Sequence, residues 1–168
     1  MENIKRKPIT LSPTEGSILS VVGDTYRILA NGKQTNGTFA IIDMLIPPDG
    51  GPGPHAHKEI EECFYVIDGE IEVKSEFGDY TASQGSFVYI PPGGVIHSFK
   101  NNTSKIAHLL CMVVPSGLEA FFEEIGSPVE PGEFLPAPPI DQQAAKTLEV
   151  TAAKYGQSIY PPNYLDVL

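Results

Sequence analysis

The stretch GPHAHKEIEECFYVIDG, residues 53–69, carries the pattern that decides both the fold and the candidate site. His55 and His57 are two residues apart, so on an extended chain both imidazoles point to the same side, about 7 Å apart at Cα, and can reach one metal ion. Glu62 comes five positions after His57, an odd spacing that places it on the opposite face of a single regular strand. If Glu62 shares the site, we expect the chain to turn or bulge within residues 58–61.

A second stretch, PGGVIHSFKN at residues 92–101, supplies a third histidine. Its Pro-Gly turn predicts a chain reversal that brings His97 back beside the first pair. Three imidazoles and one carboxylate form a mixed nitrogen and oxygen donor set that suits Fe, Mn, Ni, Cu, Co or Zn, and the donor types alone do not choose among these metals. Four protein ligands of an octahedral ion leave two positions open, which is what catalysis at a metal requires.

Residues 16–115 consist of short apolar runs separated by turn signals such as Asn31-Gly32 and Asp68-Gly69. These dipeptides supply the positive φ angles that tight hairpins need. The runs predict strands at residues 17–22, 25–30, 38–46, 63–68, 70–75, 79–82, 86–90, 97–100 and 105–114. Many short strands at this spacing indicate an all-β sandwich or barrel.

The C-terminal part has a different pattern. Leu118, Phe121, Phe122 and Ile125 follow the i, i+3, i+4, i+7 spacing of an amphipathic helix, and a second helix is predicted over residues 141–155. A proline-rich connector, residues 128–139, separates the two. We therefore divide the chain into an N-terminal segment (1–15), a β-barrel (16–115) and a helical, proline-rich extension (116–168).

Together the two histidine stretches resemble the two motifs of the cupin superfamily. The matching residues are His55, His57, Glu62 and Gly69 in the first motif, and Pro92, Gly94, His97 and Asn101 in the second. The chain departs at the leading glycines: Asp49 stands where the first is expected, beside Gly50 and Gly51, and Gly85 lies one residue further away than usual. The resemblance implies a cupin-type double-stranded β-helix, a jelly-roll barrel, with one or two C-terminal helices packed outside.

Within the cupins, Gly23-Asp24, Gly53-Pro54 and residues 115–126 make the chain similar to the single-domain, quercetin 2,3-dioxygenase-like group. This similarity implies one divalent transition metal held by the three histidines and the glutamate, with Glu62 also acting as the catalytic base. It also implies a metal-dependent oxygenase that acts on a small aromatic or enolic substrate, with dioxygen as the second substrate. A redox-neutral cyclase, isomerase or lyase, and a non-catalytic cupin that binds a small molecule, remain alternatives because cupins host all of these.

Three apolar residues, Phe64, Val66 and Phe99, share strand parity with Glu62 or His97, and we expect them to line the substrate pocket. The fourth histidine, His108, lies in an apolar strand, and we expect it to be a hydrogen-bonded structural residue.

The chain carries 11 basic and 21 acidic residues, a net charge of -10. Such a balance argues against nucleic-acid partners and against docking on anionic lipid, and no apolar stretch approaches the length of a membrane span. Cys63 and Cys111 both lie in apolar runs, which favours free thiols and a reducing cytoplasm. A homodimer is expected from the cupin resemblance, because an open sheet edge must be covered.

Overall fold

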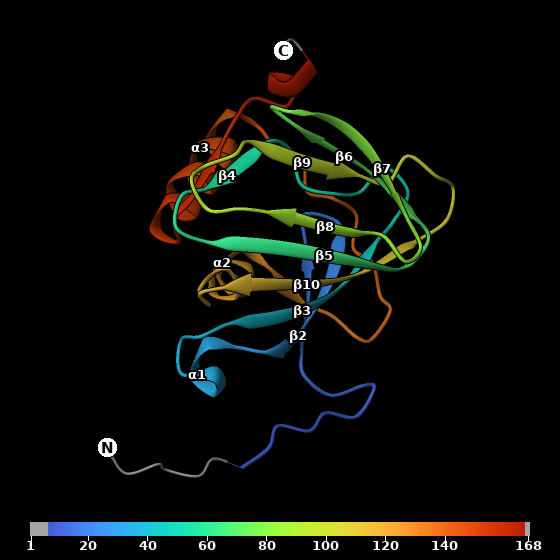
Figure 1. Cartoon of the computed structure of the whole chain (residues 1–168), viewed down its shortest axis with the longest axis vertical. Coiled ribbons are helices and arrows are strands. Elements are labelled where there is room, and N and C mark those ends of the chain that lie inside the picture. Colours follow the sequence, from blue (N-terminus) through green and yellow to red (C-terminus); the bar gives the residue numbers. More distant parts are fainter. Residues whose placement is uncertain (1–6, 167–168) are drawn as a thin grey trace.

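The computed structural model describes residues 7–166, which fold into two antiparallel β-sheets and a few helices (Figure 1). The larger sheet has the order β11-β1-β2-β3-β10-β5-β8 and the smaller one the order β12-β4-β9-β6-β7. The strands of the larger sheet are β1 (Ser17–Val21), β2 (Asp24–Ala30), β3 (Ala40–Ile46), β5 (Glu61–Asp68), β8 (Phe87–Ile90), β10 (Ala107–Val114) and β11 (Ser127–Pro128). Those of the smaller sheet are β4 (His55–His57), β6 (Glu70–Ser75), β7 (Gly78–Ser83), β9 (His97–Lys100) and β12 (Gln157–Ile159).

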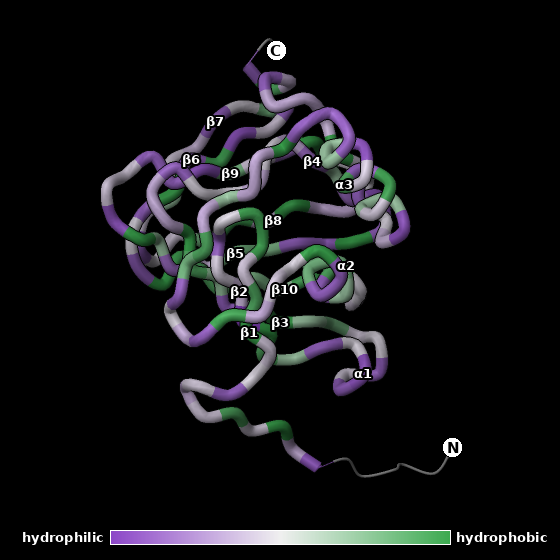
Figure 2. The backbone as a smooth tube through the Cα atoms, turned by 180° about the vertical axis from the view of Figure 1, so that it is seen from behind, coloured by the Kyte–Doolittle hydropathy of each residue, from purple (hydrophilic) through white to green (hydrophobic). Residues whose placement is uncertain are grey.

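The core lies between the two sheets and is built from the inward residues of the alternating strands. In β3, Ala40, Ile42, Met44 and Ile46 are buried while the residues between them are partly exposed. Each fully buried isoleucine contributes about 1.5–3 kcal/mol relative to an exposed one. Figure 2 shows how the apolar residues concentrate along strands such as β3 and β10. In strands such as β3 the alternation therefore fixes which side chains face the interior.

The helices are α1 (Gly32–Thr35), α2 (Leu118–Ile125), α3 (Gln142–Lys154) and the short 3-10 helix η1 (Tyr164–Asp166). Helix α2 contacts β1 and β3, and α3 contacts α2 and β12. The N-terminus of α3 is capped by Asp141, whose carboxylate accepts a hydrogen bond of 2.8 Å from the backbone N–H of Ala144. Within residues 7–166, no helix combines the length and the apolar character needed to cross a membrane.

The all-β jelly-roll prediction is confirmed, and a strand or helix forms over every range that the sequence predicted. Five short elements were not predicted separately: α1, β4, β11, β12 and η1. None of them exceeds four residues, so none contains enough residues to show a hydrophobic period. Helix α1 has no buried residue and depends on the capping box made by Asn31 and Gln34.

Candidate metal centre

Two sheets supply the four candidate ligands. Strands β4 and β9 are neighbours in the smaller sheet, where His55 pairs in register with His97. Glu62 lies on β5 in the larger sheet. The turn between β4 and β5 carries the chain from one sheet to the other, so Glu62 faces the histidines across the interior. This crossing explains why an odd spacing after His57 is compatible with a shared site, and it confirms the turn expected within residues 58–61.

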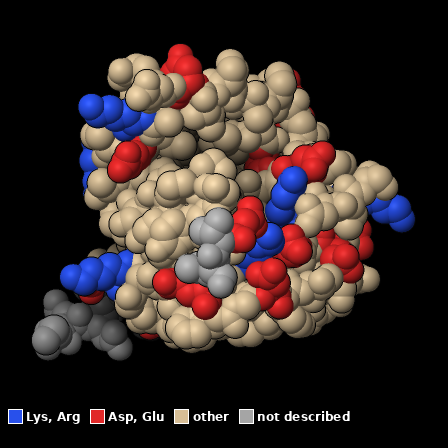
Figure 3. Space-filling model, turned by 90° about the horizontal axis from the view of Figure 1, so that it is seen from above, with Lys and Arg blue, Asp and Glu red and all other residues tan. Residues whose placement is uncertain are grey.

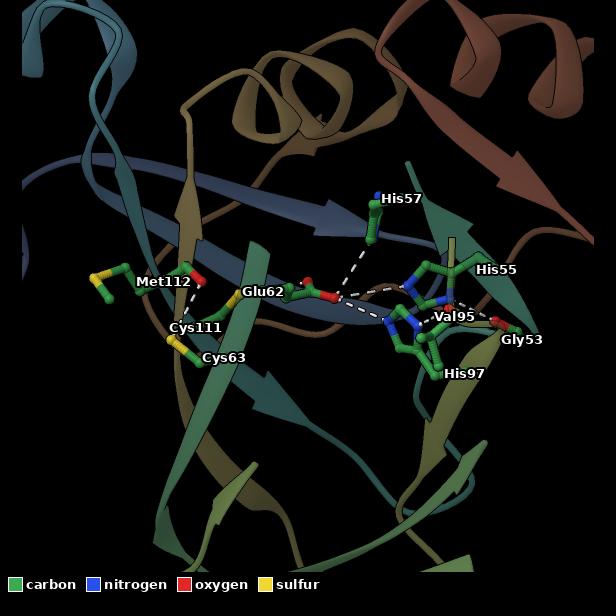
Figure 4. A network of polar contacts seen from close by, with 9 residues as sticks. All are labelled: Gly53, His55, His57, Glu62, Cys63, Val95, His97, Cys111 and Met112. Carbon is green, nitrogen blue, oxygen red and sulfur yellow. Dashed lines mark hydrogen bonds and ion pairs between the residues drawn. The ribbon is translucent and has the colours of Figure 1, made fainter. Parts of the chain in front are cut away.

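The four side chains are buried and converge on one point (Figure 4). Oε2 of Glu62 lies 3.0 Å from Nε2 of His97, 3.5 Å from Nε2 of His57 and 3.9 Å from Nε2 of His55. One donor atom from each residue lies within 4.8 Å of all the others. The cluster therefore fits a single metal site.

Backbone carbonyls orient two of the three rings. Nδ1 of His55 donates to the carbonyl oxygen of Gly53 at 2.9 Å, and Nδ1 of His97 donates to that of Val95 at 2.9 Å. A carbonyl oxygen only accepts hydrogen bonds, so the proton of each ring must be on Nδ1. In the neutral ring, this leaves the Nε2 lone pair directed at the cluster, the arrangement found for metal-binding histidines.

The charge of Glu62 governs the electrostatics of the cluster. Burial opposes its ionisation, but the three imidazoles beside its carboxylate hold the pKa of Glu62 well below its usual value. Burial lowers the pKa of His55. For His97 burial acts in the same direction, but the hydrogen bond to Glu62 outweighs it and raises the pKa. The carboxylate is thus ionised, as a metal ligand must be.

His57 provides the test of whether a cation suits the cluster. Its ring is buried, yet neither Nδ1 nor Nε2 has a hydrogen-bond partner among the described residues. An unpaired buried polar atom costs about 1–3 kcal/mol, so native structures seldom retain one without a function. A cation between the imidazoles and Glu62 would accept the Nε2 lone pair and remove the penalty at that nitrogen. The residues therefore fit a divalent transition metal.

The second oxygen of Glu62 is held by a residue that the sequence indicates only as a free thiol in an apolar run. The thiol of Cys111 on β10 lies 3.6 Å from Oε1 of Glu62 and donates to it. This contact orients the carboxylate so that Oε2 faces the three histidines. The sequence gives no signal for it, because a cysteine in an apolar strand looks like any other small buried residue.

Beside the cluster lies a cavity of about 720 Å³, whose wall includes His55 and Glu62. Of the three predicted pocket residues, Phe99 belongs to the described lining, whereas Phe64 and Val66 do not. These two are buried in the core between the sheets, and the ring of Phe64 packs edge-to-face on Phe99 with centroids 5.2 Å apart. Strand parity placed them correctly on the interior side, but it could not distinguish the core from the cavity wall.

Residues of the C-terminal helices form much of the remaining wall. Four apolar residues of α2 line the cavity: Leu118, Phe121, Phe122 and Ile125. Their helical spacing was visible in the sequence, but it was interpreted only as packing against the barrel. From α3, Lys146 and Glu149 also reach the lining. The helices thus pack on the strands and at the same time form one side of the cavity.

His108 lies away from the cluster, on the outer side of the larger sheet. Its Nε2 pairs with Oδ1 of Asp43 on the neighbouring strand β3. Arg27 on β2 contacts the other oxygen of Asp43 at 2.8 Å. The structural role expected for His108 agrees with this arrangement.

Comparisons with known proteins support the same family. The cupin domain model matches residues 42–113. Quercetin 2,3-dioxygenase of Bacillus subtilis is 27% identical over 132 residues, which cover 79% of this chain and 38% of that protein. The chain spans less than half the length of the curated relatives it matches.

Solved structures show the fold. A sugar phosphate isomerase of the cupin superfamily from Silicibacter pomeroyi superposes with a TM-score of 0.55 and 21% identity, covering 66% of this chain and 77% of that one. A predicted oxalate decarboxylase from Thermotoga maritima superposes with a TM-score of 0.56 and 18% identity, covering 65% of this chain and 99% of that one. The chain therefore has the fold of the cupins, and its residues 42–113, which include all four candidate ligands, match the cupin domain model.

Proposed function

We propose that the protein is a metal-dependent oxygenase that acts on a small aromatic or enolic substrate, with dioxygen as the second substrate. The observation that carries the proposal is a cluster of three imidazoles and a carboxylate, of which His55 and Glu62 form part of the wall of a largely apolar cavity. The similarity to a quercetin 2,3-dioxygenase supports this chemistry over the other reactions found among cupins.

Each residue of the cluster has a role in this proposal. His55, His57 and His97 hold the metal through Nε2, and Glu62 completes the ligand set through Oε2. A divalent transition metal bound there supplies Lewis acidity and a route for electrons between an enolic oxygen and dioxygen. Glu62 also acts as the base that accepts the hydroxyl proton of the substrate, because its carboxylate lies both in the cluster and in the cavity wall.

The apolar wall has two consequences for the substrate. Aromatic side chains from two elements, Phe99 on β9 and Phe121 and Phe122 on α2, offer flat surfaces on which a planar ring can pack. They also limit the water that reaches the reacting atoms, which protects a reactive intermediate from hydrolysis.

The test is dioxygen consumption by protein loaded separately with Fe(II), Mn, Ni, Cu, Co or Zn, with quercetin, a β-diketone or catechol as substrate. We expect uptake with at least one pair, and we expect Glu62→Gln to lose it even when enough metal is supplied to load the variant through the three histidines. No uptake with any pair would refute the oxygenase proposal. Substrate turnover that continues under nitrogen would instead favour a redox-neutral cyclase, isomerase or lyase.

We further propose that two copies of the chain pair through the outer face of β10, β5 and β8. Tyr65 lies opposite Phe87 and Leu110 in register, and directly paired residues point to the same side of a sheet. The exposed side chains of Tyr65 and Phe87 therefore form one continuous apolar patch with the half-buried Leu110. A second copy of the chain that presents the same patch would cover it. Light scattering should give twice the chain mass for the wild type and a single chain mass for Phe87→Asp; a monomeric wild type would contradict the proposal.

A further inference from the structure

A second buried carboxyl group belongs to the wall of the same cavity. Asp24 is the first residue of β2, is 3% exposed, and lines the cavity together with His55 and Glu62. It is not a member of the four-residue cluster that fits the metal. Its carboxyl group is therefore free to contact a different part of any molecule that occupies the cavity.

Hydrogen bonds to Asp24 leave acceptor capacity unused. The hydroxyl of Tyr26 donates to Oδ2 at 3.1 Å, and the backbone N–H of Gly51 donates to Oδ1 at 3.2 Å. A carboxylate has about four lone-pair sites, so these bonds use half of them. No ion pair of Asp24 is found within residues 7–166. A buried carboxylate without a cation is unfavourable unless further donors reach it.

A purely structural role accounts poorly for this carboxylate. The loop containing Gly51 is already anchored without it, by a hydrogen bond of 2.8 Å from the N–H of Asp49 to the carbonyl of Asn101 and by one of 2.9 Å from the N–H of Asn101 to the carbonyl of Gly50. The bond from Gly51 to Asp24 is thus an additional attachment. A neutral acceptor such as asparagine would make it without a buried acid.

The raised pKa of Asp24 agrees with a carboxyl group that has too few hydrogen-bond donors around it. Burial raises the pKa of Asp24 to about 7, against the hydrogen bonds from Tyr26 and Gly51, which lower it. Among the charged groups on the elements around it, Asp49 and Lys100 pair with each other at the surface at 3.3 Å. Burial raises the pKa of Tyr26, and the charges of Asp24 and of Glu62, across the cavity, add to this shift.

We propose that Asp24 is a ligand-recognition residue that accepts a hydrogen bond from a hydroxyl group of the bound molecule, separate from the oxygen that reaches the metal. The inference rests on the proposed function in placing the substrate in this cavity, and it narrows the substrate class. The ligand is a polyhydroxylated aromatic or enolic compound: one oxygen lies at the His55, His57, His97 and Glu62 cluster, and a second hydroxyl lies at Asp24.

The experiment compares two ligands and two proteins in the absence of dioxygen. Quercetin and the unsubstituted flavonol share the enolic oxygen pair, but the unsubstituted flavonol lacks quercetin's other hydroxyls. Equilibrium binding of both is measured with metal-loaded wild type, Asp24→Asn and the control Asp49→Asn. We expect the wild type and the control to prefer quercetin by about tenfold, the equivalent of one hydrogen bond to a charged group, and Asp24→Asn to lose that preference.

Comparing both ligands with each protein separates an effect on ligand recognition from an effect on the stability of the fold. Equal weakening of both ligands by Asp24→Asn would show a structural role and overturn the proposal, as would a wild type that binds neither ligand or has no preference. If the variant does not fold, the carbon NMR signal of the Asp24 carboxyl in the wild type decides: it should shift with quercetin and stay in place with the unsubstituted flavonol. Dioxygen uptake is measured separately, so tight binding without uptake would refute the oxygenase and leave this inference intact.

Discussion

Nε2 of His57 lies 3.5 Å from Oε2 of Glu62, and still the buried ring has no hydrogen-bond partner at either nitrogen among residues 7–166. His55 and His97 each have a backbone carbonyl at Nδ1, so His57 is the ring whose burial most needs another partner. A metal ion bound between His57 and Glu62 would therefore provide the partner that the buried Nε2 of His57 lacks.

Replacing His57 by alanine should abolish tight metal binding. Loss of a residue that only orients a ligand weakens metal binding about 10–100-fold, so loss of a ligand should exceed about 100-fold. Metal affinity and content, measured by competition with a chelator and by mass spectrometry, check this. The matched control is His108→Ala, which removes a histidine paired with Asp43 outside the cluster. Equal metal content in both variants would contradict the assignment.

Cys111 should influence the metal through Glu62. Cys111→Val removes the thiol donor to Oε1 at similar volume, and we expect metal affinity to fall by about tenfold, while Cys111→Ser restores a donor and much of the affinity. The control is Cys63→Val, whose thiol contacts the carbonyl of Met112 instead. If the valine and serine variants of Cys111 bind metal equally, the thiol does not position the carboxylate.

Two glycines with similar φ angles should respond differently to replacement by alanine. Gly51 and Gly93 have φ angles of +120° and +115°, which alanine rarely adopts, so each substitution strains the backbone by about 1–3 kcal/mol. A Cβ at Gly51 would lie 2.2 Å from the carbonyl oxygen of Phe99, whereas no described atom lies within 4 Å of one at Gly93.

Gly51→Ala should therefore lower the free energy of unfolding by more than about 4 kcal/mol. Gly93→Ala should lower it only by the backbone strain of about 1–3 kcal/mol. Urea denaturation measures both values. Equal losses would show that the approach of the loop to β9 is looser than described.

The raised pKa of Asp24 predicts how stability depends on pH. Its pKa rises from 3.8 to about 7 on folding, so between these values the folded chain holds a proton that the unfolded chain has released. The contribution of Asp24 to the free energy of unfolding must then fall as pH rises through this window, by up to about 4 kcal/mol in total. Asp24→Asn should flatten this slope in urea titrations, and the exposed control Asp79→Asn should not. If stability depends on pH equally in Asp24→Asn and in the wild type, Asp24 is not a buried carboxyl group without an ion pair.

The strands and the four-residue cluster could be predicted because each is marked by a short local pattern of residues. His55 and His57 occupy alternate positions of one strand, and the Pro-Gly turn before His97 signals the reversal that brings β9 beside β4. The turn before Glu62 was inferred from parity, although the sequence did not reveal that it joins two different sheets.

The cavity wall could not be predicted in the same way. Phe64 and Phe99 each lie two residues after a candidate ligand on their own strand, but only Phe99 belongs to the described lining. Asp24 and Cys111 contact Gly51 and Glu62, residues far away in sequence. Contacts of this kind arise from the assembled fold and leave no periodic pattern.

The central claim, that three imidazoles and Glu62 gather around one cation, is tested most directly by anomalous diffraction from crystals grown with a divalent transition metal. We predict one strong anomalous peak per chain, about 2.0–2.2 Å from Nε2 of His55, His57 and His97 and from an oxygen of Glu62. Crystals with no peak at this position, or with the three rings turned away from one another, would contradict the account.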